Sequence, residues 1–268
     1  PLLLLLTFLG LAFIHMALNV ANDYFDTKLG ADPANRRPTP FSGGSRSLQY
    51  GLISESGAKL LFASFFAIGS ATGLYLAFTR GLVEILTLMG LGLFLSYFYT
   101  APPFKLAYRG LGELAVGTGF GPVIVLGSYF VQTRSLSVEA FLASVPIGLL
   151  IMLILYVNEI PDAPYDRAAG KMHLVARFTE KQTLRFLAAS FVALYLVIAL
   201  IPVLRLGPWL VLAGLATIPT AQRIYRMVKE TFGNQYAMIP VLALNVRNAV
   251  VTGALVAAGY ALGAILGL

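Results

Sequence analysis

The sequence contains no cysteine, only two histidines and few charged residues. Without cysteine, the chain can form no disulfide framework, thiol nucleophile or thiolate metal site. Any catalysis must therefore use carboxylates, amides, basic groups, tyrosine or the two histidines. Charged residues make up 12% of the 268 positions, against about 25% in a typical soluble domain. This shortage of charge argues against a disordered protein and against an ordinary soluble enzyme.

Apolar residues, in contrast, are abundant and occur in long runs. They make up 58% of the chain, and the mean hydropathy is +0.80. Eight runs approach the length needed to cross about 30 Å of hydrocarbon. They cover residues 1–22, 58–78, 82–99, 111–132, 138–158, 183–204, 207–222 and 239–268. Because the runs are continuously apolar and do not alternate, they predict helices and not barrel strands.

We therefore expect an all-α, polytopic transmembrane helical bundle with eight visible spans. Residues 1–268 are expected to form a single integral-membrane domain. Residue 1 already lies in a span, and no charged leader or cleavage-site pattern precedes it, so no signal peptide is expected.

Basic residues favour one side of the predicted membrane protein. Alternating crossings place residues 23–57, 100–110, 159–182 and 223–238 on the same side. These loops and the adjoining helix starts hold all 19 Lys and Arg residues except Arg80, Arg134, Arg205 and Arg247. The positive-inside rule makes this side cytoplasmic, and we expect a multi-pass protein of the plasma or inner membrane. The charge is divided among loops without a nucleic-acid motif, so no nucleic-acid partner is expected.

Two groups of polar residues close the first and fifth runs. The first motif comprises Asn22, Asp23 and Asp26, and the second motif comprises Asn158, Asp162 and Asp166. In each, an Asn is followed four residues later by an Asp, which places both on one helical face. The two motifs are separated by four predicted helices. We therefore expect two pseudo-repeats, at about 1–132 and 138–268.

Acids are unfavourable at these positions unless a cation compensates them. Each carboxylate in the last turn of a helix costs about 0.3 to 1 kcal/mol. A set of oxygen ligands without cysteine selects Mg²⁺ over zinc, and Mg²⁺ prefers one or two carboxylates together with substrate phosphates. The sequence thus predicts a magnesium diphosphate clamp with Asp23, Asp26, Asp162 and Asp166 as ligands, and Asp32 as a further candidate. The alternative is that the acids only solvate loops or pair with Arg36, Arg37 and Arg167.

A third polar element follows the third run. Pro102 and Pro103 end the predicted helix, because proline lacks a backbone donor and restricts the residue before it. Lys105 and Arg109 are thereby placed near the membrane edge, where they can meet a phosphate. The alternative is that both are anchors whose side chains extend to the membrane surface.

Three sequence runs together resemble the UbiA superfamily of intramembrane aromatic prenyltransferases, and the first run is most similar to its menaquinone (1,4-dihydroxy-2-naphthoate polyprenyltransferase) branch. They are NDYFDTKLGAD at 22–32, YTAPPFKLAYRGLGE at 99–113 and NEIPDAPYDRAAGK at 158–171. The resemblance implies nine transmembrane helices, the first of which would precede this chain, and a cap of long loops on the cytoplasmic side. It also implies transfer of a prenyl group from a prenyl diphosphate to an aromatic acceptor, with Mg²⁺ between the two motifs.

Carried onto this sequence, the resemblance implies roles for the residues of the two motifs and for Lys105, and we expect further contacts from other residues of the same side. Catalytic roles fall to Asp23, Asp26, Asp162, Asp166 and Lys105. Contacts to the substrate diphosphate are expected from Asn22, Asn158, Arg46, Tyr99, Arg109 and Lys171. The chain departs from the family pattern at Glu159, Pro161 and Pro164, and in the run Pro40 to Arg46.

The expected reaction is ionisation of the prenyl diphosphate, followed by attack of an electron-rich ring on the allylic cation. The acceptor stays open among dihydroxynaphthoate, hydroxybenzoate, homogentisate, a porphyrin and a glycerol-phosphate lipid. Prenyl length and oligomeric state are not predicted. Two other functions stay open, a secondary transporter and a membrane phosphotransferase acting on lipid alcohols.

Overall fold

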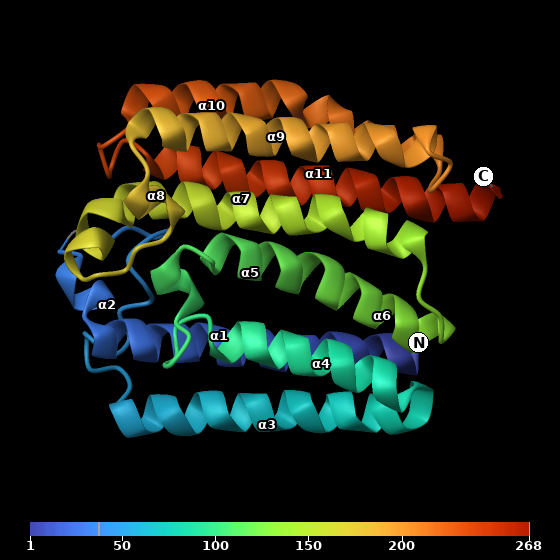
Figure 1. Ribbon diagram of the computed structural model, residues 1–268, viewed down its shortest axis with the longest axis horizontal. Helices are drawn as coiled ribbons and strands as arrows, with labels where there is room; N and C mark the ends of the chain where they lie inside the picture. Colours follow the sequence, from blue (N-terminus) through green and yellow to red (C-terminus); the bar gives the residue numbers. More distant parts are fainter. Residues whose placement is uncertain (37, 268) are drawn as a thin grey trace.

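The computed structural model describes residues 1–36 and 38–267, and it is a bundle of long, nearly parallel and antiparallel helices (Figure 1). Within the described residues there is no β-strand, only an isolated bridge between Thr39 and Ser42. The predicted all-α fold is therefore confirmed.

The longest helices of the described residues are α1 (Leu2–Leu29), α3 (Glu55–Arg80), α7 (Val138–Ala168), α9 (Glu180–Val203) and α11 (Ile239–Leu266), with the shorter α4 (Leu82–Tyr97) beside α3. The remaining α-helices are α2 (Ala31–Ala34), α5 (Gly112–Thr118), α6 (Ile124–Thr133), α8 (Leu174–Arg177) and α10 (Ile218–Thr231). Two short 3₁₀-helices, η1 (Leu106–Arg109) and η3 (Trp209–Thr217), and a π-helical turn, η2 (Gly119–Val123), complete the chain.

Most of the predicted membrane spans are present as apolar helices. Among the described residues, six stretches are long and apolar enough to cross a membrane, including Gly112–Thr133, which runs through α5, η2 and α6. Helix α4 is apolar but shorter, with 16 residues. The predicted run 207–222 is occupied by η3 and the first part of α10. The chain is therefore a multi-pass membrane protein, and the number of eight spans stays a prediction.

The side chains explain where several long helices begin. The Ser54 side chain accepts a hydrogen bond from Gly57 N at the start of α3, and Ser137 does the same for Ala140 N at the start of α7. At the start of α9, Thr179 and Gln182 form a reciprocal capping box. These caps satisfy backbone donors that have no partner within their own helix.

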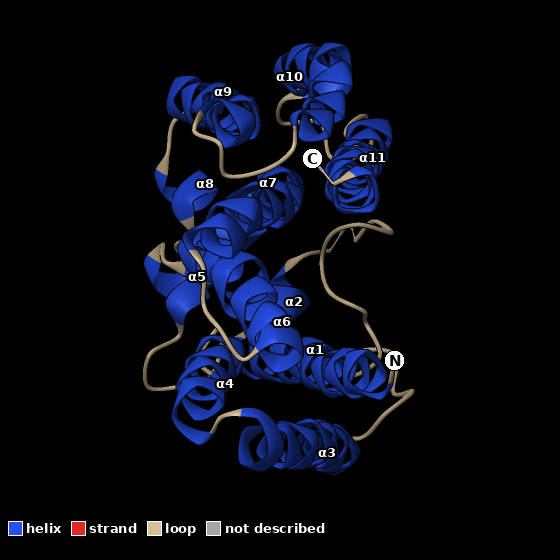
Figure 2. Cartoon of the chain, turned by 90° about the vertical axis from the view of Figure 1, so that its right-hand side faces the viewer, coloured by secondary structure: helices blue, strands red, loops and turns tan. Residues whose placement is uncertain are grey.

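Helix α7 is the centre of the bundle. Viewed end-on, it lies between a group formed by α9, α10 and α11 and a group formed by α1, α3 and α4 (Figure 2). Half of its most apolar 18-residue window is buried inside the protein, against 17% for the corresponding windows of α1 and α3. Side chains of α7 such as Leu153 and Tyr156 form the main core with α9 and α11. The apolar outer faces of α1 and α3 are left for lipid.

Both polar motifs lie inside helices, which corrects one expectation from the sequence. Residues 23–57 and 159–182 were predicted to be connecting loops, but α1 continues to Leu29 and α7 to Ala168. In α1, the Asn22 side chain donates to Asp26 across one helical turn, at 3.0 Å. In α7, Pro161 and Pro164 each remove a backbone donor, yet the packing of α2 and α8 against this segment keeps it helical.

The helix ends that carry the motifs meet at one end of the bundle. Figure 1 shows α2, α8 and the last turns of α1 and α7 at the left end, opposite the two chain termini. Alternation of helix direction is what brings them together, as the sequence predicted. The polar side chains of both motifs thus lie at the same end of the bundle.

Candidate functional site

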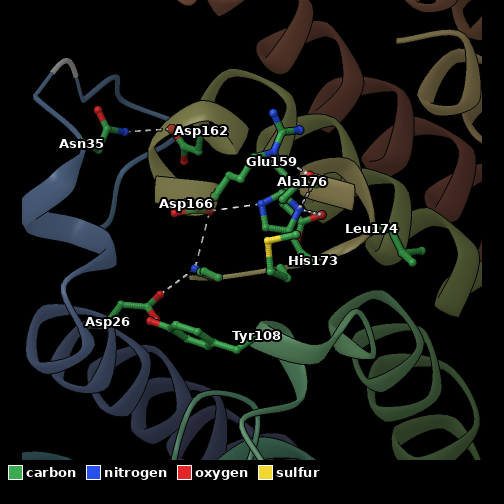
Figure 3. A network of polar contacts seen from close by, with 12 residues as sticks. Asp26, Asn35, Tyr108, Glu159, Asp162, Asp166, His173, Leu174 and Ala176 are labelled. Carbon is green, nitrogen blue, oxygen red and sulfur yellow. Dashed lines mark hydrogen bonds and ion pairs between the residues drawn. The ribbon is translucent and has the colours of Figure 1, made fainter. Parts of the chain in front are cut away.

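Asp26, on α1, receives hydrogen bonds from three parts of the chain. The Tyr108 hydroxyl donates to Oδ1 at 2.7 Å, and Lys171 Nζ donates to Oδ2 at 2.7 Å. The Asn22 amide also donates to Oδ2. The Asp26 side chain is buried, so these donors replace the water that a carboxylate would otherwise bind. Figure 3 shows Asp26 and Tyr108 on the side of the site opposite Asp166 of α7.

Lys171 joins the two motifs. Its Nζ atom lies 2.7 Å from Asp26 Oδ2 and 3.9 Å from Asp166 Oδ2. One ammonium group therefore contacts a carboxylate of each motif. Burial alone would lower the pKa of Lys171, but the charges of Asp26 and Asp166 raise this pKa well above its ordinary value. Lys171 is therefore a fixed positive charge between the first and second motifs.

Asp162 is bound to the segment that follows α2. Its Oδ1 accepts a hydrogen bond from the Asn35 amide at 2.9 Å (Figure 3). Its Oδ2 accepts one from Gly43 N at 2.8 Å. Residues 38–54, here called the cap loop, also reach the first motif, because Ser45 N donates to Asp23 Oδ1 at 3.3 Å. The cap loop therefore contacts both motifs.

Asp32, on α2, lies beneath the cap loop. Burial, followed by the negative charge of Asp26, raises the pKa of Asp32 to about 7. Its Oδ2 atom is buried and has no hydrogen-bond partner. Gly44 covers this carboxylate with a φ of +74°, and a Cβ at Gly44 would lie 2.6 Å from Asp32 Oδ2. Only glycine allows this combination of backbone conformation and close approach.

Of the other predicted contact residues, some lie close to the acids of the two motifs and one does not. Asn158 lies on α7 with a buried Oδ1 atom that has no partner. Lys105 Nζ lies 5.6 Å from the centre of the Tyr108 ring, and Lys171 Nζ lies 5.8 Å from the same centre. Arg109 is exposed and donates to the Pro103 carbonyl, so the structure does not bring it to the acids.

Arg46 is buried in the cap loop and has a structural task there. Its guanidinium donates to the carbonyls of Asp32 and Asn35, at 2.7 and 2.5 Å. These bonds fasten the cap loop to α2 and leave the guanidinium turned toward the backbone. Its contact with a diphosphate stays a prediction.

Tyr99 connects the acidic site with an apolar cavity. It packs in a small cluster with Ala31, Ala107 and Tyr108, and burial, with the nearby charge of Glu159, raises the pKa of its hydroxyl well above the ordinary value. Tyr99 also lines a cavity of about 160 Å³ between α1, α3, α4 and α6. The cavity wall is almost entirely apolar, with glycines and leucines and the single histidine His15.

Sequence reasoning missed Tyr108, Asn35 and His173. Tyr108 stands between the two predicted basic contacts, and His173 follows Lys171 by two residues. The His173 Nε2 atom lies 3.2 Å from Asp166 Oδ2 (Figure 3). Nearness in sequence to predicted residues could have suggested both. The contact of Asn35 with Asp162 depends on how the chain folds over 127 positions and has no local signal.

The acidic site fits a hard divalent cation. The two motifs offer only carboxylate and amide oxygens, which Mg²⁺ prefers over nitrogen or sulfur. The ammonium of Lys171 already stands between Asp26 and Asp166, where positive charge is favourable. Asp32 offers a buried oxygen without a hydrogen-bond partner.

Comparison with known proteins gives a consistent result over nearly the whole chain. A profile of the UbiA prenyltransferase family matches residues 1–245. A 2-carboxy-1,4-naphthoquinone phytyltransferase of Synechocystis sp. is 31% identical over 91% of this chain and 76% of its own length. The 1,4-dihydroxy-2-naphthoate octaprenyltransferase of Bacillus subtilis is 32% identical over 84% of this chain and 72% of its own. The enzyme with that name from Escherichia coli is 28% identical over 97% and 84%.

The fold is also shared with a solved membrane protein. A structure of digeranylgeranylglyceryl phosphate synthase in membranes matches with a TM-score of 0.60 and covers 97% of this chain and 85% of its own. The sequence identity of this pair is 20%, so the likeness concerns the arrangement of helices.

Proposed function

Because this chain belongs to the UbiA prenyltransferase family, we propose that it transfers a polyprenyl group from a prenyl diphosphate to a dihydroxynaphthoate acceptor within the membrane. The observation that carries this proposal is the bridge of Lys171 between Asp26 and Asp166, since it joins the two motifs at one charged site. The naphthoate acceptor is favoured by the names of the relatives, which are naphthoate or naphthoquinone prenyltransferases.

The residues that would hold the metal are the carboxylates of both motifs, Asp23, Asp26, Asp162 and Asp166, with Asp32 as an additional ligand. Bound Mg²⁺ supplies positive charge that neutralises the diphosphate. The basic groups of the chain act beside it. Lys171 lies between Asp26 and Asp166, and both Lys105 and Lys171 lie near the Tyr108 ring. Both can donate to phosphate oxygens.

The reaction that follows from this site is an ionisation. The allylic carbon–oxygen bond breaks, and the diphosphate leaves with the electron pair of that bond. The acceptor ring then forms a carbon–carbon bond to the allylic cation and regains its aromaticity by releasing a proton. Tyr99 packs beside Tyr108 at the charged site and also lines the apolar cavity, and an apolar lining of this kind protects the cation from water.

The apolar cavity is suited to the isoprenoid chain. Tyr99 lies in its wall together with residues of α1, α3, α4, α5, η2 and α6, so a tail that extends from the diphosphate past Tyr99 would pass into apolar surroundings. Burial of each methylene group contributes about 0.8 kcal/mol. The head and tail of the substrate are thus held by different parts of the chain.

Activity can be tested with the purified chain in lipid nanodiscs. We expect product, detected by mass spectrometry, from a polyprenyl diphosphate and 1,4-dihydroxy-2-naphthoate in the presence of Mg²⁺, with diphosphate released in equal amount. EDTA is expected to abolish turnover, and excess Mg²⁺ to restore it. A panel containing hydroxybenzoate, homogentisate and a glycerol-phosphate lipid tests the acceptor. Turnover of one of these in place of dihydroxynaphthoate would refute the acceptor, and metal-independent turnover would refute the metal role.

The site is also proposed to face the cytoplasm, in accordance with the positive-inside rule. The absence of cysteine makes this easy to measure. Tyr50→Cys places a thiol in the cap loop, and Ser135→Cys places one at the opposite end; both positions are exposed. A membrane-impermeant maleimide added to intact cells is expected to label Ser135→Cys and not Tyr50→Cys. The reverse pattern would contradict the orientation.

A further inference from the structure

A second acidic cluster lies behind the candidate active site. It is formed by Glu113 on α5, Glu159 on α7 and His173 immediately before α8. One ligand atom from each side chain lies within 4.8 Å of the others. The three residues are 2%, 6% and 0% exposed. None of the three is among the predicted Mg²⁺ ligands, although His173 contacts Asp166 of the second motif, and the reaction described above does not use them.

The carboxylates of this cluster are not balanced by hydrogen-bond donors. Both oxygens of Glu159 and the Oε2 atom of Glu113 are buried and have no hydrogen-bond partner. An unpaired buried acceptor costs about 1 to 3 kcal/mol, and a charged one costs more. Glu159 Oε2 also faces His173 Nδ1 at 3.4 Å. Several acceptors converging on one buried point indicate that a positive species belongs between them.

We propose that Glu113, Glu159 and His173 bind a divalent first-row transition-metal ion, with Zn²⁺ the best match. A tetrahedral ion with bonds of about 2.0 to 2.1 Å places neighbouring nitrogen and oxygen ligands roughly 3.4 Å apart. The Nδ1 to Oε2 distance of 3.4 Å agrees with such an edge. Zinc binds both imidazole nitrogen and glutamate oxygen, and three protein ligands that leave a fourth position open are common at zinc sites.

The surrounding hydrogen bonds are those that metal ligands normally have. A histidine that binds a metal commonly donates its other ring N–H to a carboxylate. His173 Nε2 stands 3.2 Å from Asp166 Oδ2, in position for this bond. A ligating carboxylate is usually hydrogen-bonded as well. Glu113 Oε1 accepts such a bond from Leu174 N at 2.8 Å.

The ligand chemistry argues against Mg²⁺ at this place. Mg²⁺ dehydrates reluctantly and keeps several waters, whereas these three side chains are almost completely buried. An imidazole nitrogen suits Zn²⁺ and its neighbours in the first transition series. The ion would take the Nδ1 lone pair that now accepts a long hydrogen bond, 3.2 Å, from Ala176 N.

Metal content of the 268-residue chain tests the proposal directly. The protein, purified in detergent, is loaded with Zn²⁺, passed over a desalting column in buffer with millimolar Mg²⁺, and analysed by elemental mass spectrometry. We expect about one Zn²⁺ per chain, retained in the presence of Mg²⁺. Replacement by Co²⁺ is expected to give visible absorption bands that change when His173 is substituted.

Isosteric variants assign the ion to the cluster. Glu159→Gln and Glu113→Gln are each expected to lower Zn²⁺ affinity at least tenfold. His173→Asn removes the ring ligand, while its side-chain oxygen can still accept from Ala176 N and cap α8. The matched control is Asp26→Asn, which makes the same carboxylate-to-amide change in the first motif and is expected to retain Zn²⁺.

Two results would overturn the proposal. The first is a wild-type chain that holds no Zn²⁺, Mn²⁺ or Co²⁺ after loading, which would mean that the two glutamates share a proton instead. The second is a Glu159→Gln chain that elutes as a folded protein and keeps the ion with wild-type affinity. Wild-type metal content decides the question even if a variant fails to fold.

Discussion

The two acidic clusters of this protein differ in how their charge is balanced. Around Asp26, the carboxylate oxygens have a tyrosine, an asparagine and a lysine as donors. At Glu159, both side-chain oxygens are buried and have no hydrogen-bond donor. The first cluster is therefore stable before any ligand arrives and can exchange its lysine contacts for a substrate. The second depends on a bound positive species, so we regard it as a site that stays occupied.

Removing a carboxylate from the first cluster is expected to have the largest effect on activity. Asp26→Asn and Asp162→Asn each keep the side-chain shape but remove charge that would hold the metal diphosphate. We expect each to lower turnover by roughly 10³-fold, which corresponds to about 4 kcal/mol. Product formation measured in nanodiscs, with size-exclusion elution as the folding control, checks this. Turnover within a factor of ten of wild type in either variant would contradict the clamp.

Lys171→Met makes the first cluster resemble the second, because it leaves Asp26 and Asp166 facing each other without a cation. Removing one partner of a buried ion pair is strongly destabilising, by about 3 to 5 kcal/mol. We expect a lower melting temperature in EDTA and a larger gain on adding Mg²⁺ than in the wild type, together with roughly 100-fold lower turnover. An equal Mg²⁺ response in the two proteins would show that Lys171 does not stand in for a cation.

Tyr108→Phe tests a single donor to Asp26. The hydroxyl donates to Oδ1 at 2.7 Å in a buried setting, and a hydrogen bond to a charged group contributes about 1.5 to 3 kcal/mol. We expect turnover to fall roughly tenfold or more. The aromatic ring, which lies near Lys105 and Lys171, is kept in this variant. The variant therefore tests the hydroxyl alone. Unchanged kinetics would mean that Asp26 is positioned without Tyr108.

Gly44→Ala is expected to disturb the cover of Asp32, and Gly51→Ala is its matched control. Both glycines have positive φ, +74° and +68°, but only at Gly44 would a Cβ meet the Asp32 carboxylate, at 2.6 Å. Both variants carry the backbone cost of about 1 kcal/mol. We expect Gly44→Ala to lower the melting temperature more than Gly51→Ala does. We also expect Gly44→Ala to weaken activation by Mg²⁺, whereas Gly51→Ala is activated as the wild type is. Equal effects would contradict the close packing of the cap loop.

The smallest predicted effect is the pH dependence at Asp32. Its pKa rises from 3.8 to about 7 on folding, so the folded chain binds this proton more tightly than the unfolded chain. Stability of the metal-free protein is therefore lost as pH rises between these two values. Asp32→Asn removes the effect, and its gain in melting temperature over wild type is expected to be larger at about pH 8 than at about pH 6. A gain that does not change with pH would refute the raised pKa.

Much of the fold could be predicted from the sequence, because the backbone N–H and C=O groups of a long apolar run in lipid find hydrogen-bond partners most easily within a helix. Alternating directions then placed Asp26 and Asp166 at one end, and the bridge through Lys171 agrees with that expectation. The ends of α1 and α7 were predicted too early, since polar residues there extend the helices and do not end them.

The contacts of the cap loop could not be predicted in the same way. Asn35 reaches Asp162, and Arg46 is directed to the backbone carbonyls of Asp32 and Asn35. Neither has a periodic signal, because both depend on how an irregular segment folds over the helix ends. The pairing of Glu113 with Glu159 likewise arises only when α5 packs on α7.

The central claim is that the two motifs jointly bind one metal diphosphate. Calorimetric titration of the wild type with an unreactive prenyl thiolodiphosphate, with and without Mg²⁺, tests it together with Asp26→Asn, Asp162→Asn and the double variant. We predict Mg²⁺-dependent binding in the wild type that each single variant loses, so that the double variant is no weaker than either one. Mg²⁺-dependent binding that persists in one single variant, or losses that add independently in the double variant, would contradict the shared site.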